Sequence, residues 1–257
     1  MPLSSPLLLA ALSGCGSPAP ADPAAERATY RAALTEPDAE AAVARCATLV
    51  DPMLRGDCVV GVMQLTGDRD PAHCAQVPAD SPFFAECWFT AADDPDLPLD
   101  ARWGRCAPAG HLGPECRQHQ RGREAARIGE GDAPVPDKVA RVAALVARDR
   151  HRDDAVNGFV DRTWYALWLG HHKRAGRTSL AVCEGLADAA DPCRAATDQL
   201  IEHTVRQAVR ADPGRCAEPV EALASLRAGA GPALGDEPAV LARAEGHRAR
   251  ACRPHAR

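Results

Sequence analysis

Two cysteines bracket a helix-start signal in the stretch Cys46-Ala47-Thr48-Leu49-Val50-Asp51-Pro52-Met53-Leu54-Arg55-Gly56-Asp57-Cys58. Asp51 followed by Pro52 is typical of a helix N-terminus, because the carboxylate accepts bonds from free backbone N–H groups and proline lacks one. We therefore expect one helix to end near Cys46 and an antiparallel helix to carry Cys58. A disulfide closing a loop of this size contributes about 3 kcal/mol in the chain-entropy description.

The same spacing recurs along the chain, which has eleven cysteines. Setting Cys15 aside leaves an even number, and further helix-start signals (Ser81-Pro82, Gly113-Pro114, Asp191-Pro192) lie inside the other close pairs. In an oxidising compartment such cysteines are expected to be paired. The predicted disulfides are Cys46–Cys58, Cys74–Cys87, Cys106–Cys116, Cys183–Cys193 and, from the two cysteines that are left, Cys216–Cys252.

The first three close pairs follow one another with a period of about thirty residues, which is typical of helical repeats. Local sequence similarity is also present: Asp70-Pro71-Ala72-His73-Cys74 resembles Asp212-Pro213-Gly214-Arg215-Cys216. We predict an all-α fold, an array of disulfide-stapled antiparallel helical hairpins that is either solenoid-like or a compact bundle, beginning with a repeat region over 26–128. The arrangement resembles the cysteine-rich Sel1-like helical repeat proteins. Residues 117–123 are polar almost all round, so this helix is expected at the edge of the array.

Gly129-Glu130-Gly131-Asp132-Ala133-Pro134-Val135-Pro136 reads as a linker over 129–137. It is followed by a C-terminal helical region, 138–257, with the two further cysteine pairs. Apolar residues at helical spacing predict three helices there, and no segment alternates with the period of a strand. Their stripes are Val139, Val142, Leu145 and Val146; Val156, Phe159, Val160, Trp164, Leu167 and Trp168; and Leu200, Ile201, Val205 and Val209.

The N-terminus carries a short apolar run that ends in Leu12-Ser13-Gly14-Cys15. This resembles the lipobox of bacterial lipoproteins, which implies a signal peptide over 1–14, lipidation (palmitate included) of Cys15 and a tether over 15–25. The resemblance implies export and anchoring in the bacterial cell envelope. Gly16 takes the place of the aspartate linked to inner-membrane retention, so the outer membrane is favoured if the cell has two membranes.

The net charge of −5 argues against a broad nucleic-acid surface. The basic stretch is the tail, where Arg243, Arg248, Arg250, Arg253 and Arg257 stand against Glu245. It is either a solvated helix end, favoured by the helix dipole, or a contact with anionic lipid headgroups.

Three groups of residues are candidates for catalysis or metal binding. His151 with Asp154, Asn157 and Asp161 could serve acid–base catalysis, or form a capped and solvated helix start beside the aromatic core residues Trp164, Tyr165 and Trp168. His171-His172-Lys173-Arg174 could bind a metal, but positive groups also suit a helix C-terminus. Asp93-Asp94-Pro95-Asp96 with Asp100 could hold Ca²⁺, or form a solvated turn.

No Cys-x-x-Cys, His-Glu-x-x-His, Gly-x-Ser-x-Gly or glycine-rich phosphate loop is present. We therefore assign no catalytic residue, metal ligand or cofactor, and regard enzyme activity as less expected than binding. The predicted function is a lipid-anchored binding or scaffold module with a protein or envelope partner and no nucleic acid. One alternative is a periplasmic enzyme built on the helix His151–Asp161, and a second is metal sequestration through free thiolates and histidines.

Overall fold

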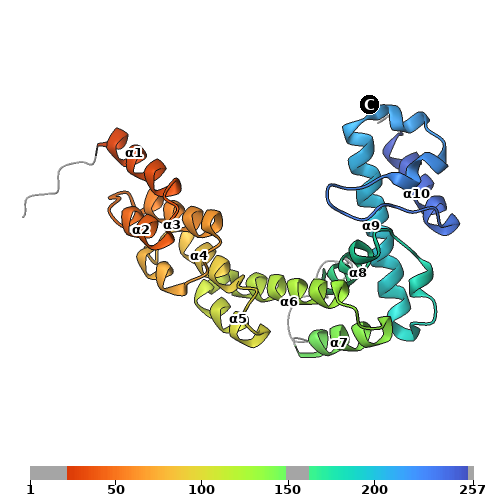
Figure 1. Ribbon diagram of the computed structural model, residues 1–257, viewed down its shortest axis with the longest axis horizontal. Helices are drawn as coiled ribbons and strands as arrows, with labels where there is room; N and C mark the ends of the chain where they lie inside the picture. The colour runs from red at the N-terminus through yellow and green to blue at the C-terminus, as the bar shows by residue number, and fades with distance from the viewer. Residues whose placement is uncertain (1–21, 149–161, 254–257) are drawn as a thin grey trace, which may run out of the picture. The chain divides into compact units, whose positions relative to one another are not determined.

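The fold is all-α, as the sequence predicts (Figure 1). The computed structural model describes residues 22–148 and 162–253. Within these ranges there is no β-strand, and an isolated parallel bridge joins Arg177 and Ala233. The α-helices are α1 (Pro23–Leu34), α2 (Ala39–Cys46), α3 (Pro52–Thr66), α4 (Phe83–Ala92), α5 (Leu99–Cys106), α6 (Gly113–Glu130), α7 (Val135–Arg148), α8 (Arg162–Ala175), α9 (Ala190–Ala211) and α10 (Pro238–Ala251). Short 3₁₀ turns are η1 (Pro71–Gln76), η2 (Ala107–Leu112), η3 (Ala181–Cys183), η4 (Ala187–Ala189), η5 (Pro213–Ala217) and η6 (Val220–Ser225).

The chain divides into two compact units, Met1–Phe84 and Ala85–Arg257, with the boundary in the first turn of α4. The predicted linker at 129–137 is therefore wrong. Gly129 and Glu130 belong to α6, and α7 begins at Val135, so only a short turn separates two helices of the second unit. Glycine and proline are equally suited to a tight turn between packed helices and to a linker, and composition alone does not distinguish the two.

The predicted helix-start signals are confirmed only in part. At Asp191-Pro192 the prediction of a capping aspartate is wrong, because α9 begins at Ala190 with Ala189 as its N-cap and no side chain caps it, and α6 likewise begins at Gly113 without a side-chain cap. Asp51 Oδ1 accepts bonds from the backbone N–H of Met53 at 2.8 Å and Leu54 at 3.4 Å, and starts α3. The similar segments that begin at Asp70-Pro71 and Asp212-Pro213 also have similar structures, because each aspartate caps a 3₁₀ turn that contains a cysteine.

Disulfides close the helical turns. The structure contains Cys46–Cys58, Cys106–Cys116, Cys183–Cys193 and Cys216–Cys252, with Cα–Cα distances of 5.6–5.8 Å, and these are pairs that the spacing predicts. Cys74 and Cys87 are also disulfide-bonded. The first cysteine ends an α-helix at Cys46 and Cys106, but Cys74, Cys183 and Cys216 lie in 3₁₀ turns instead. The expectation of two α-helices per disulfide is therefore wrong for the disulfides of these three cysteines.

The first unit is built from α1, α2 and α3. The Tyr30 hydroxyl donates a 2.7 Å hydrogen bond to Asp57 Oδ2, which ties α1 to α3 and raises the pKa of Tyr30 to about 12. Cys58 and Val62 of α3 are buried, whereas Leu65 is 67% exposed. The buried apolar residues include Ala33, Ala42, Val43, Leu49, Val59 and Met63.

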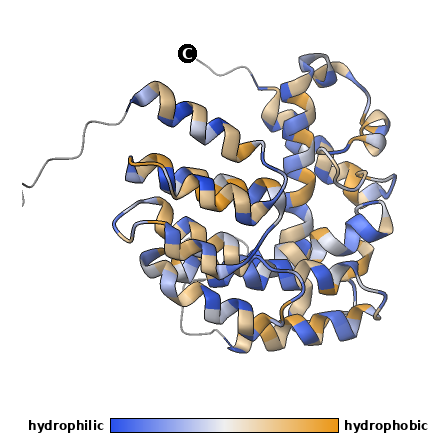
Figure 2. Ribbon diagram, turned by 60° about the vertical axis from the view of Figure 1, so that its left-hand side comes forward, coloured by the Kyte–Doolittle hydropathy of each residue, from blue (hydrophilic) through white to orange (hydrophobic). Residues whose placement is uncertain are grey.

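The second unit has its core where α6, α7, α8 and α9 meet. Hydrophilic and hydrophobic residues alternate along the helices in Figure 2, as expected of helices that bury one face. Val142 and Leu145 of α7 pack with Leu167 and Trp168 of α8, in agreement with the predicted stripes. A neighbouring cluster joins α9, η6 and α10 through Ile201, Val205, Leu223, Leu234 and Val240.

Helix α6 lies inside this unit, which corrects the expectation that its polar sequence marks an edge. Ala125 and Ile128 belong to the core, and Gln120 and Arg121 are also buried. Arg121 Nε donates to Thr163 Oγ1 at 2.8 Å. The hydropathy of 117–123 is misleading because Gln120 Oε1 and Arg121 Nε find hydrogen-bond partners on neighbouring helices, Arg102 of α5 and Thr163 of α8.

Two glycines bring α6 and α8 into backbone contact. A Cβ added at Gly129 would lie 2.2 Å from Leu167 O, and one added at Gly170 would lie 2.4 Å from Ala126 O. Glycine in a helix interior costs about 1 kcal/mol relative to alanine. The helices keep glycine here because any side chain would force the two backbones apart.

No helix in the described ranges is both long enough and apolar enough to cross a membrane.

We predict that Gly129→Ala and Gly170→Ala each lower the free energy of unfolding by about 1–3 kcal/mol, because overpacking outweighs the gain in helix propensity. Urea denaturation followed by circular dichroism measures the effect. Gly104→Ala in α5 is the matched control, because a Cβ added at this position would meet no atom within 4 Å. This substitution should leave the free energy of unfolding unchanged or raise it by up to about 1 kcal/mol. Equal effects at the three positions would contradict the close approach.

Candidate functional site

Some of the predicted site residues fall outside the described residues. These are Cys15 and the four members of the proposed acid–base group, His151, Asp154, Asn157 and Asp161. Trp168, in contrast, is 1% exposed, and Trp164 and Tyr165 pack against the same core. This aromatic group is a structural part of α8.

The acidic loop after α4 is held by ion pairs. Asp93 Oδ1 lies 3.3 Å from Arg123 Nε, Asp94 Oδ2 lies 3.2 Å from Arg105 Nη1, and Asp100 pairs with Arg148. No group of three or more His, Cys, Asp or Glu in the described ranges is arranged to hold a metal ion. The carboxylates that could serve as Ca²⁺ ligands therefore attach the loop to α5, α6 and α7.

The adjacent histidines at the end of α8 have separate environments. His172 is fully buried, and its Nε2 lies 3.2 Å from Thr197 Oγ1 on α9. Burial, together with the charge of His171, lowers the pKa of His172 from 6.5 to about 3. The expectation of a positive group at this helix end is therefore wrong for His172, because desolvation keeps its ring neutral.

His171 faces Lys138 of α7, with 3.5 Å between His171 Nδ1 and Lys138 Nζ. Burial and the charge of Lys138 lower the pKa of His171. Lys138 Nζ also donates to Gly129 O at 2.7 Å, near the C-terminal end of α6. This lysine thus joins α7 to a backbone carbonyl of α6 that lies in the last helical turn.

Arg248, one of the tail arginines, makes hydrogen bonds that connect helix α10 to the turn η5. Arg248 Nη1 donates to Cys216 O at 2.6 Å and Glu218 O at 2.9 Å, and Nη2 bonds Glu245 at 2.6 Å. Arg248 therefore ties α10 to η5, next to the Cys216–Cys252 disulfide.

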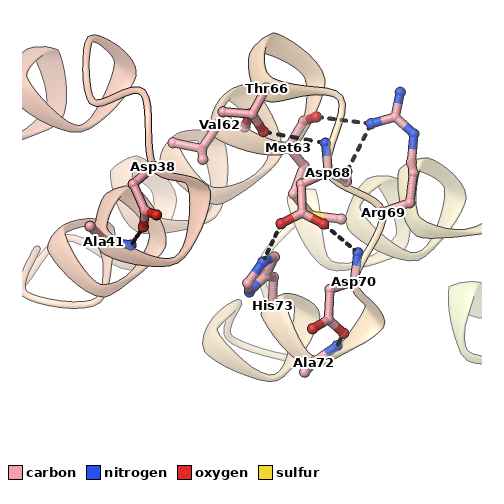
Figure 3. Close-up of polar contacts among 10 residues, drawn as sticks. All are labelled: Asp38, Ala41, Val62, Met63, Thr66, Asp68, Arg69, Asp70, Ala72 and His73. Atoms are coloured by element: carbon pink, nitrogen blue, oxygen red, sulfur yellow. Dashed lines mark hydrogen bonds and ion pairs between the residues drawn. The ribbon is translucent and has the colours of Figure 1, made fainter.

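A polar network in the first unit includes an Asp–His pair that the sequence reading did not single out (Figure 3). Asp68 Oδ2 lies 2.9 Å from His73 Nε2, and Asp68 Oδ1 accepts from Asp70 N at 2.8 Å. Burial raises the pKa of Asp68, but hydrogen bonds from the Asp70 backbone and from His73 outweigh it, and the pKa lies below its usual value.

This network closes the turn between α3 and η1. Gly67 ends α3 with φ of 76°, and Arg69 Nη1 donates to Met63 O at 2.8 Å. The cysteine next to His73 is disulfide-bonded and offers no thiolate. The Asp–His pair therefore orders a turn, and none of its contacts among the described residues is with a nucleophile that it could activate.

A cleft in the second unit is the strongest candidate for a ligand site. It has a cavity volume of about 370 Å³ and is formed by α4, α6 and α8. Its lining residues are Phe89, Glu115, Gln118, His119, Gly122, Arg123, Ala126, Arg162 and Ala166. Ligand cavities of small molecules are of this order, about 300–1,000 Å³.

The floor of the cleft results from the close packing of α6 and α8. Gly122, Ala126 and Ala166 leave little side-chain volume there, and a Cβ on Gly122 would stop 4.0 Å from that of Ala166. One wall is aromatic, with the Phe89 and His119 ring centroids 5.0 Å apart. Arg123 and Arg162 also line the cleft and bring two guanidinium groups to it.

The charges of the cleft are only partly compensated. Asp93 pairs with Arg123 and lies 3.7 Å from His119 Nε2. Arg162 has no ion-pair partner among the residues that the structure describes. The cleft can therefore offer a guanidinium to an anion beside an apolar floor.

No protein-family model, curated protein or solved structure matches this chain. The functional conclusion therefore rests on the chain's own residues.

The cleft was not predicted from the sequence, although the sequence contains one signal for it. Gly122, Ala126 and Gly129 are spaced at i, i+4 and i+7, which places small residues along one helix face. Such a face permits close helix packing, but the sequence does not say which helix packs there. Arg162 is brought to the site only by this pairing.

We predict that His172 makes folding acid-sensitive. The pKa of His172 is lower in the folded than in the unfolded chain, so between pH 6.5 and about 3 the unfolded state binds a proton that the folded state does not. The free energy of unfolding therefore decreases as the pH is lowered through this window. At pH 5 the loss from this group is about 2 kcal/mol. Urea denaturation at pH 7.5 and pH 5 should show a smaller pH dependence for His172→Gln than for the wild type.

His203, exposed on α9, provides the control. His203→Gln should retain the pH dependence of the wild type. A wild-type dependence that persists in His172→Gln would mean that other groups cause it.

Proposed function

We propose that this chain is a lipid-anchored binding module of the bacterial cell envelope, exported and held by a lipid on Cys15. The observation that carries the binding role is the α4–α6–α8 cleft, where Arg162, which has no ion-pair partner among the described residues, lies beside small apolar residues. The lipobox-like Leu12-Ser13-Gly14-Cys15 carries the anchoring role.

The disulfides support this proposal and weigh against metal sequestration. All ten cysteines between 46 and 252 are disulfide-bonded, so none provides a thiolate for a metal ion. Disulfides of this number are typical of an oxidising, extracytoplasmic compartment.

The titratable groups described above support binding over catalysis. Lys138, His172 and Asp68 each contact groups that join or terminate helices. A catalytic base, in contrast, must reach a proton of the substrate. In this proposal the cleft binds and the helices and disulfides supply a rigid support.

Metabolic labelling with an alkyne fatty acid, in a bacterial host with two membranes, tests the anchor. We expect labelled protein in the outer-membrane fraction for the wild type. Cys15→Ala should lose the label, because no other thiol is available for acylation, and Ser17→Ala, which leaves the lipobox intact, should keep it. Label that persists in Cys15→Ala, or is absent from the wild type, would refute the lipid anchor.

A further inference from the structure

We propose that the α4–α6–α8 cleft binds a small organic monoanion with a flat apolar body, such as an aromatic carboxylate, with Arg162 as the principal anion-binding group. This inference rests on the proposed binding function and names the ligand class of the same cleft. Three features of the cleft support it.

The first feature is an open, apolar floor. Gly122, Ala126 and Ala166 line the cleft, and none has a side chain larger than a methyl group. The pair Gly129 and Gly170 holds the two helices close, so the floor is fixed by backbone packing and does not depend on flexible side chains. A flat apolar group can therefore lie on the floor without displacing protein atoms.

The second feature is an aromatic wall. The ring centroids of Phe89 on α4 and His119 on α6 are 5.0 Å apart at an interplanar angle of 48°, so the two rings contact each other in a tilted geometry. Both residues line the cavity. Aromatic rings attract a further ring in offset or edge-to-face geometry, which favours an aromatic ligand over a purely aliphatic one.

The third feature is an uncompensated cation. Asp93 lies against Arg123 and restrains it, whereas Arg162 has no ion-pair partner within the described ranges. Its neighbour Thr163 accepts a hydrogen bond from Arg121, which sets the register of α8 against α6 at this point. A carboxylate matches a guanidinium in geometry and charge, since two parallel N–H···O bonds can form.

Glu115 limits the charge of the ligand. It lines the cleft on α6, two turns before Gly122, and it also lacks an ion-pair partner among the described residues. A second negative charge on the ligand would meet this carboxylate, so the cleft suits a monoanion and disfavours a polyanion.

Ligand-observed fluorine NMR tests the proposal on the mature chain with Cys15→Ser, so that lipidation has no part in the result. The probes are 4-fluorobenzoate, its neutral analogue 4-fluorobenzamide and the cation 4-fluorobenzylamine. We expect 4-fluorobenzoate to bind with a Kd of about 1 mM and at least fivefold more tightly than either analogue, with weaker binding at high salt.

Arg162→Gln should weaken 4-fluorobenzoate binding by about five- to tenfold and leave the amide unchanged, because it removes a charge and keeps a polar side chain. Arg141→Gln, at an exposed position of α7, is the matched control and should bind like the wild type. Ala166→Leu should abolish binding by filling the floor, with near-ultraviolet circular dichroism to verify the fold.

The proposal is overturned if no probe binds at 5 mM (about five times the expected Kd), if the amide or amine binds as tightly as the carboxylate, or if Arg162→Gln has no effect. Preference for the amine would change the ligand class and leave a binding cleft. Loss of fatty-acid labelling, in contrast, concerns only the anchor and does not affect these measurements.

Discussion

The second unit depends on the backbone contact between α6 and α8. Gly129 and Gly170 permit it, and each position excludes even a methyl group because a carbonyl oxygen of the other helix lies against it. This contact brings Ala125 and Ile128 to Leu167 and Trp168, and it buries Arg121 next to Thr163. It also leaves the shallow floor of the cleft where the small residues continue toward the start of α8. Core and candidate site thus share one cause.

Disulfides provide both cross-links and core volume in this chain. Aromatic residues make up only 4% of the sequence, so few large side chains are available to fill an interior. Eight of the half-cystines are fully buried, and Cys106 and Cys116 form a buried cluster with Ala92. Cys46–Cys58, Cys106–Cys116 and Cys183–Cys193 each close a short loop, and such a bridge restricts the unfolded chain. A thin hydrophobic core is thereby compatible with long solvent-exposed helices.

Polar side chains perform much of the joining between helices. Arg102 is 1% exposed, donates to Gln120 and pairs with Glu124 at 2.6 Å, which holds α5 to α6. Lys138 joins α7 to α6, and Arg248 joins α10 to η5. Buried polar groups must be paired, so these contacts also specify the register of the helices. Arg162, which has no such partner among the residues that the structure describes, lines the cleft together with Arg123.

The sequence by itself determined the class of the fold, several of its helix starts and the disulfide spacing. These features are local: an aspartate caps the N–H groups two or three residues ahead, and cysteines about a dozen residues apart meet when the chain turns once. Tertiary structure decided what local patterns cannot encode. Gly129 reads as a linker residue in sequence and serves as a helix-packing residue, and Arg121 reads as a solvent-facing residue and is buried. His172 reads as a cation and is kept neutral by the helix that covers it. The cleft belongs to this second group, because Phe89, Arg123 and Arg162 come from three helices, and only their packing brings them together.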